Sequence, residues 1–75
     1  MELTEENVNK VIDFMNPFAV ANGGSIQFIE LESETKTIKV KISKTGDMTI
    51  ERMMELIEEN LKHEMPDCLE VVQVL

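Results

Sequence analysis

The sequence has little of several residue types, and each shortage narrows what the chain can be. Its 75 residues contain one cysteine, no tryptophan or tyrosine, three glycines and two prolines. A single cysteine cannot form an internal disulfide, so a disulfide framework is excluded. The scarcity of glycine and proline, together with an apolar fraction of 43%, argues against a disordered chain. Because only three residues are Phe, the core must be built from Val, Ile, Leu and six Met.

Positive charge is also scarce. Seven Lys and Arg stand against fifteen Asp and Glu, which gives a net charge of −8. Such a charge repels phosphate backbones and anionic lipid, so we expect neither nucleic acid nor a membrane as a partner. The opening MELTEENVNK lacks the apolar segment of a signal peptide, and no apolar run approaches the ~20 residues of a membrane span. These features predict one small acidic domain over residues 1–75, located in the cytoplasm.

The first part of the chain has the spacing of an amphipathic helix. Thr4 is placed to act as its N-cap, and apolar residues follow at the intervals of one buried stripe: Val8, Val11, Ile12 and Met15. Because a residue before proline avoids helical geometry, Asn16-Pro17 is expected to end or kink this helix. The step Asn22-Gly23-Gly24 is a stronger break, and a glycine there can supply the positive φ at which many helices end.

Two strands are expected next. Residues 25–33 and 37–43 have the strand-like composition of an antiparallel hairpin, and 37–43 alternates cleanly between apolar and polar side chains. Within 25–33 the alternation changes phase after Phe28, which indicates either a central strand covered on both faces or a bulge. We favour a central position for this strand because both of its faces carry apolar residues.

A second helix and a third strand complete the predicted fold. The helix is expected over residues 48–64, capped by Asp47 or Thr49, and the strand over residues 68–75. The fold class is therefore α+β. We predict a small α-β-β-α-β domain with a three-stranded mixed sheet and two helices packed on one face.

Two long segments of the sequence are similar to a known family. The segment IDFMNPFAVANGGSIQFIEL (12–31) resembles the start of the NifU C-terminal (Nfu) domain, where a helix and a proline precede a (D/N)GG step into the first strand. The segment IEENLKHEMPDCLEVVQV (57–74) resembles its end, where a helix is followed by a proline and a Val-rich strand. The resemblance implies an iron–sulfur cluster scaffold or carrier.

The residues that would hold a cluster are missing, however. Members of the family carry C-x-x-C in the loop between the second strand and the second helix, and two chains combine four thiolates around a [4Fe–4S] cluster. Here residues 42–48 read ISKTGDM, with neither cysteine. We therefore interpret the loop as an emptied cluster site and expect it to bind protein, with Met48 exposed and Leu56 on its flank. The expected interaction surface consists of Asn22, Gly23, Gly24, Lys44, Thr45, Gly46, Asp47 and Met48.

Cys68 and His63 are the remaining candidates for metal ligands, and the pattern favours neither. Two copies of the chain supply only two thiols, whereas a [4Fe–4S] cluster normally takes four. His63 precedes Cys68 by five residues, but the pair has no third ligand. The ordinary interpretation is a small buried cysteine and a histidine near a helix end. We expect no bound metal and no cofactor.

Three hypotheses for function follow, and no catalytic residue is expected in any of them. No Ser, Cys or His is accompanied by an activating partner, so we do not expect an enzyme. An RNA-binding KH-like domain shares the element order but needs positive charge and a G-x-x-G loop. The first hypothesis is a protein-binding accessory module of iron–sulfur cluster assembly, a monomer or weak homodimer that contacts other assembly factors. The alternative is a cluster scaffold or carrier that uses Cys68 with partner-supplied or non-Cys ligands. A structural domain whose function the sequence does not expose is the third possibility.

Overall fold

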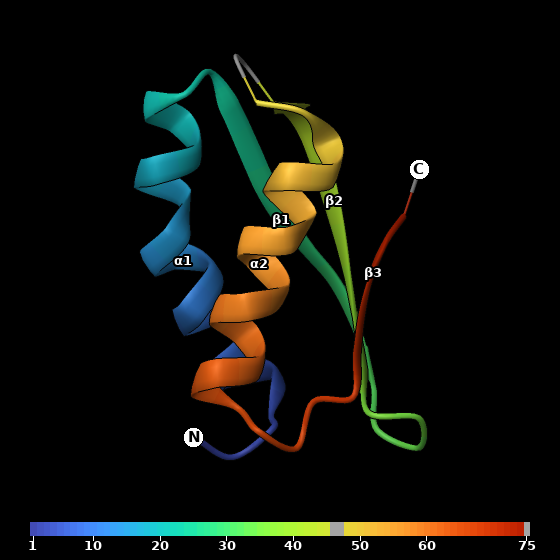
Figure 1. Cartoon of the computed structure of the whole chain (residues 1–75). Coiled ribbons are helices and arrows are strands. Elements are labelled where there is room, and N and C mark those ends of the chain that lie inside the picture. Colours follow the sequence, from blue (N-terminus) through green and yellow to red (C-terminus); the bar gives the residue numbers. More distant parts are fainter. Residues whose placement is uncertain (46–47, 75) are drawn as a thin grey trace.

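The computed structural model describes residues 1–45 and 48–74 and has the predicted architecture. The elements are α1 (Glu5–Ala21), β1 (Gly24–Glu32), β2 (Thr37–Thr45), α2 (Ile50–Glu64) and β3 (Glu70–Gln73). β1 pairs antiparallel with β2, and β2 pairs parallel with β3. Both helices lie on the same face of this mixed sheet (Figure 1). The predicted α+β fold is confirmed. Neither of these helices is long and apolar enough to cross a membrane.

The core lies between the two helices and the inward face of the sheet. The apolar residues of the alternating segment 37–43, Ile38, Val40 and Ile42, are all buried. They pack with side chains from both helices in one cluster that includes Val8, Ile12, Met15, Met53, Ile57, Leu61 and Met65. Full burial of an aliphatic side chain of this size is worth about 1.5–3 kcal/mol. Apolar burial is therefore the main force that holds the helices on the sheet.

The position of β1 differs from our expectation. The strand order is β1-β2-β3, so β2 is central and β1 is an edge strand. The phase change in β1 arises from a bulge: Phe28 pairs with Val40 and Glu30 with Lys39, which leaves Ile29 as the extra residue. Ile29 is 41% exposed, and Leu31 returns to the inward face and packs against the core. A bulge and two-sided burial give the same sequence pattern, and we favoured the wrong one.

Both helices begin at caps expected from the sequence. The Thr4 side chain accepts a hydrogen bond from the Asn7 amide, and the Thr49 side chain accepts one from the Arg52 amide. Of the two outcomes expected at Asn16-Pro17, an end or a kink of the first helix, the end is wrong, because α1 continues through Pro17 to Ala21. Proline leaves the carbonyl four residues earlier without its helical donor. That carbonyl belongs to Asp13, an exposed residue, so water is available to replace the lost partner.

A side chain beside the proline joins α1 to the sheet. Asn16 Nδ2 donates to the Ile26 carbonyl at 2.9 Å, and the Ile26 amide donates to Asn16 Oδ1 at 2.9 Å. The side-chain amide thereby satisfies both backbone groups of one residue in β1, as a neighbouring strand would. This pair of bonds fixes the distance between α1 and the start of β1.

Candidate functional site

The two segments of the expected interaction surface lie at one end of the sheet. Gly24 is the register partner of Thr45, and Ser25 is the partner of Lys44. The antiparallel pairing therefore brings the Asn22–Gly24 step beside the end of β2, close to the start of α2 (Figure 1). Gly46 and Asp47, which we also assigned to this surface, lie outside the described residues.

The Asn22–Gly24 step is held rigidly by backbone hydrogen bonds. The Asn22 amide donates to the carbonyls of Phe18 and Ala19 at 3.2 and 3.1 Å, and the Gly23 amide donates to Val20 at 2.9 Å. Gly23 has a φ of 84°, the left-handed conformation that a residue with a Cβ adopts only at a cost. The expected positive φ at the end of α1 is confirmed. This half of the surface is a preformed turn.

The burial of Met48 differs from our expectation. This residue is half-buried and packs against the core, whereas we expected it to be exposed on a helix over residues 48–64. Because α2 begins at Ile50, the helical angle does not extend back to Met48. Met48 therefore anchors the start of the helix and contributes only part of its side chain to the surface.

Cys68 and His63 do not form a metal site with other described residues. Cys68 is 4% exposed, and its Sγ donates to the Glu70 carbonyl at 3.5 Å. Burial raises the pKa of the Cys68 thiol, so the thiolate that binds metal is disfavoured. His63 is exposed on α2 beside Glu59 and Asn60. No cluster of three or more His, Cys, Asp or Glu side chains suited to a metal ion occurs within residues 1–45 and 48–74.

Cys68 also lies far from the segment in which the family resemblance expects C-x-x-C. Residues 42–45 and Met48 precede α2, and Cys68 follows it. A helix of 15 residues is ~22 Å long at 1.5 Å per residue. The thiol therefore lies at the opposite end of α2 from that segment.

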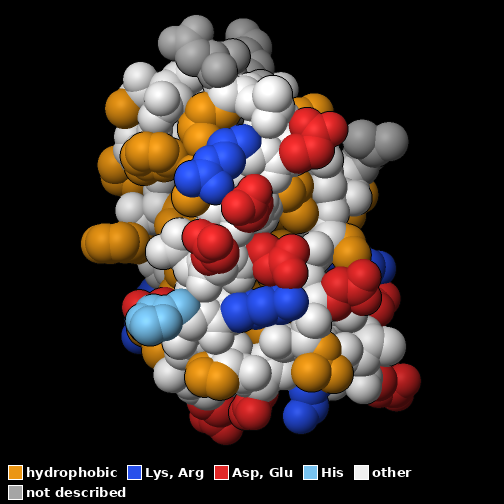
Figure 2. All heavy atoms as spheres, in the orientation of Figure 1, with side chains coloured by type: hydrophobic (Ala, Val, Ile, Leu, Met, Phe, Trp, Pro, Cys, Tyr) orange, Lys and Arg blue, Asp and Glu red, His pale blue; other side chains and the backbone are white. Residues whose placement is uncertain are grey.

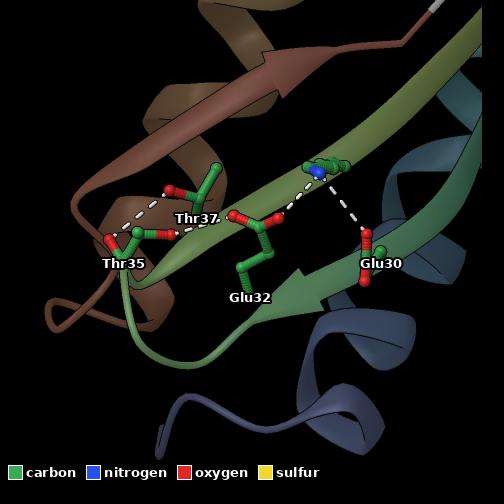
Figure 3. A network of polar contacts seen from close by, with 5 residues as sticks. Glu30, Glu32, Thr35 and Thr37 are labelled. Carbon is green, nitrogen blue, oxygen red and sulfur yellow. Dashed lines mark hydrogen bonds and ion pairs between the residues drawn. The ribbon is translucent and has the colours of Figure 1, made fainter.

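On the open face of the sheet, polar side chains form a network in which they contact one another (Figure 3). Lys39 Nζ contacts Glu32 Oε1 at 2.8 Å and Glu30 Oε2 at 3.4 Å, and Thr35 Oγ1 donates to Glu32 Oε2 at 3.1 Å. The hydrogen bond to Glu32, followed by that to Glu30, raises the pKa of Lys39, and the bonds from Lys39 and Thr35 lower the pKa of Glu32. Lys39, Glu30 and Glu32 are thus engaged with one another. The network stabilises the hairpin, and none of these three side chains is directed at a ligand.

A further feature, which the sequence pattern hardly indicated, is an apolar hollow between the helices. Its volume is ≈ 260 Å³, and its lining includes Phe14 and Phe18 from α1 and Leu56 and Asn60 from α2. Phe14 is 81% exposed and Phe18 is 52% exposed. Their spacing of four residues, beside the buried stripe of α1, was the available signal, but spacing does not tell whether another element covers them. Leu56, which we placed on the flank of Met48, lines this hollow.

Comparison with known proteins gives one similarity over the whole chain. No family model matches the sequence. The chain is similar to NifU-like protein 1, chloroplastic, of Oryza sativa subsp. japonica, with 31% identity over 77 aligned positions. The alignment covers 100% of this chain and 32% of the rice protein, so the chain spans about a third of that relative's length. The similarity agrees with the family resemblance found in the two sequence segments.

Proposed function

We propose that this chain is a NifU-like domain that takes part in iron–sulfur cluster assembly by binding other assembly proteins, without holding a cluster of its own. Similarity to a NifU-like protein along the whole chain supports the biological context. The position of Cys68 supports the second part of the proposal, that the chain holds no cluster of its own. The chain's sole thiol is buried behind the C-terminus of α2, remote from the loop in which the family resemblance expects the cluster ligands.

The residues present do not fit a [4Fe–4S] cluster. Such a cluster takes four thiolates, and two copies of this sequence supply two thiols. Burial favours the protonated form of Cys68, and the nearest backbone acceptor, the Glu70 carbonyl, already takes its hydrogen bond. We therefore assign no step of the function to a cluster held by this chain.

The proposed binding surface is the end of the sheet where the Asn22–Gly24 step lies beside Lys44 and Thr45 at the end of β2. Rigid strands and a preformed turn position this surface, as they do at many recognition loops. The chain acts there as a docking module, with no catalytic residue and no cofactor. The cytoplasmic location and the state of monomer or weak homodimer stay predictions.

A matched pair of charge reversals on β2 tests the proposed surface. Purified iron–sulfur assembly proteins from the same cell are titrated against the chain by calorimetry, together with Lys44→Glu and Lys41→Glu. Both lysines belong to β2, but only Lys44 lies at the proposed surface, opposite Ser25. We expect Lys44→Glu to weaken binding of an assembly protein by about tenfold, since charge reversal in an interface costs on the order of 1 kcal/mol or more. Equal effects of the two variants would refute this surface, and binding to no assembly protein would refute the function.

A further inference from the structure

The hollow between the helices continues into a second one. The second hollow also measures ≈ 260 Å³ and is lined by residues that include Phe14, Asn60, Lys10 and Glu64. Because Phe14 and Asn60 border both hollows, the two form a groove that follows the helix pair. We call this surface the helix groove.

The shape of the helix groove suits a row of protein side chains. Its first hollow lies against Phe18 and Leu56 and its second against Lys10 and Glu64, so the groove is elongated along the helix pair. A small-molecule site, by contrast, is usually a single cleft that buries most of its ligand. Apolar groups line the hollows, and the exposed rings of Phe14 and Phe18 border the first of them. Exposed apolar surface between two helices is the type of site that accepts one face of an amphipathic helix.

The charge around the groove selects the chemistry of the helix that binds. Figure 2 shows acidic side chains gathered over α2, with basic side chains among them, next to apolar side chains on the side of α1. Glu64 lines the groove, and Glu59 lies beside Asn60 on its rim. Neither carboxylate forms an ion pair with another described residue. The lining also contains two cations: Lys10, which pairs with Glu6 at 3.5 Å, and the N-terminal ammonium of Met1, which donates to the Glu64 backbone carbonyl at 2.6 Å. With Glu6 included, three carboxylates stand against these two cations, so the rim keeps a net negative charge.

We propose that the helix groove binds an amphipathic helix of a partner protein, with apolar side chains on one face and Lys or Arg beside them. The proposal rests on the function of protein binding and adds a second surface with a partner of defined chemistry. The apolar face fills the groove against Phe14 and Phe18, and the basic residues meet Glu59 and Glu64. A second copy of this chain is a poor occupant, because grooves that met face to face would bring the carboxylates of two α2 helices together.

A synthetic peptide is the probe that tests this proposal. The peptide has about 18 residues, or roughly five helical turns, with Leu on one face and Lys and Arg beside it. In one comparison peptide every Lys and Arg is replaced by Glu. In another the same residues are reordered so that the leucines share no face. Binding to the metal-free chain is followed by NMR, and we expect the first peptide to shift the amide signals of Phe14, Leu56 and Asn60.

Variants of exposed residues identify the groove as the binding site. Phe14→Ala and Phe18→Ala should each weaken binding by about tenfold, as expected for an aromatic anchor, and Glu59→Gln with Glu64→Gln should weaken it and reduce its dependence on salt. Leu69→Ala is the matched control, because Leu69 is an exposed apolar residue outside the groove lining. Since Phe14 and Leu69 are 81% and 67% exposed, neither replacement removes a core side chain.

Three results would overturn the proposal. These are equal binding of the acidic peptide, unchanged binding by Phe14→Ala and Phe18→Ala, and a dimer of the chain that Phe14→Ala dissociates in sedimentation velocity. The last result would make a second copy the occupant. Because the test needs neither a cluster nor Lys44, its failure would leave the binding surface at the end of the sheet standing. Conversely, failure of the charge-reversal test would not change the result with the peptides.

Discussion

Asn16 is predicted to be the residue that contributes most to stability through a single polar side chain. Its amide forms two hydrogen bonds to the backbone of Ile26, and both are partly buried. Replacement by Ala leaves an amide and a carbonyl of an edge strand without protein partners. Each lost bond of this kind costs about 0.5–1.5 kcal/mol, so Asn16→Ala should lower the free energy of unfolding by about 1–3 kcal/mol.

Asn9 provides a matched control on the same helix. Its Nδ2 donates to the Glu5 carbonyl at 3.1 Å, but the contact is exposed and water can replace it. Replacing either Asn by Ala gains helix propensity of about 0.5 kcal/mol, and this gain cancels when the two variants are compared. The difference between Asn16→Ala and Asn9→Ala therefore isolates the bonds that join α1 to β1.

Urea unfolding followed by circular dichroism measures this difference. With a slope of about 1 kcal/mol per molar urea for a small domain, a loss of about 2 kcal/mol moves the midpoint by about 2 M. Asn16→Asp keeps the acceptor for the Ile26 amide but replaces the donor to its carbonyl, so it should fall between the parent and Asn16→Ala. Equal midpoints for Asn16→Ala and Asn9→Ala would refute the role of Asn16 as the link between helix and sheet.

Three further predictions follow from single residues. Gly23→Ala should cost about 1–2 kcal/mol in urea unfolding, because Gly23 has a left-handed φ; an unchanged midpoint would show that the turn has another conformation in solution. Burial raises the pKa of the Cys68 thiol in the folded chain. The contribution of the protonated thiol to folding stability is therefore complete below the ordinary thiol pKa and is lost as the pH rises through the pKa of the folded state. The parent should therefore lose more stability than Cys68→Ala as the pH rises above the ordinary thiol pKa value of 9.0, and parallel curves would contradict this. Because Lys39 and Thr35 lower the pKa of Glu32, its contribution is lost as the pH falls below the ordinary value of 4.5; Glu32→Gln should show a smaller acid loss than the parent, and an equal loss would contradict the role of this network.

Local patterns predicted most of the fold because they report local physics. The alternation in residues 37–43 identified the buried face of β2, and Thr4 and Thr49 carried the chemistry of helix caps. The features that local patterns did not predict depend on which elements lie next to one another in the fold. The phase change at Ile29 did not reveal whether a third strand or a bulge caused it, and the link from Asn16 to Ile26 spans ten positions without a local signal.

The candidate site was predicted by a different route. The interpretation of residues 42–48 as an emptied cluster site came from the resemblance to the Nfu family and from no feature of composition or periodicity, and it stays a prediction. The hairpin then placed Gly24 beside Thr45 as antiparallel pairing requires. The helix groove was missed because the exposure of Phe14 and Phe18 depends on the absence of a covering element among the described residues, and a pattern of apolar spacing contains no such information.

Anaerobic reconstitution with ferrous iron and sulfide tests the central claim most directly. The parent, Cys68→Ala and a chain in which residues 43–48 are replaced by the family's G-x-C-x-x-C-P loop are compared by bound iron, bound sulfide and visible absorbance. We predict no stoichiometric cluster on the parent and about one [4Fe–4S] cluster for each pair of grafted chains, because four thiolates then meet at one site. A stable cluster on the parent that is lost in Cys68→Ala would contradict the account and show that this chain holds a cluster through its buried thiol.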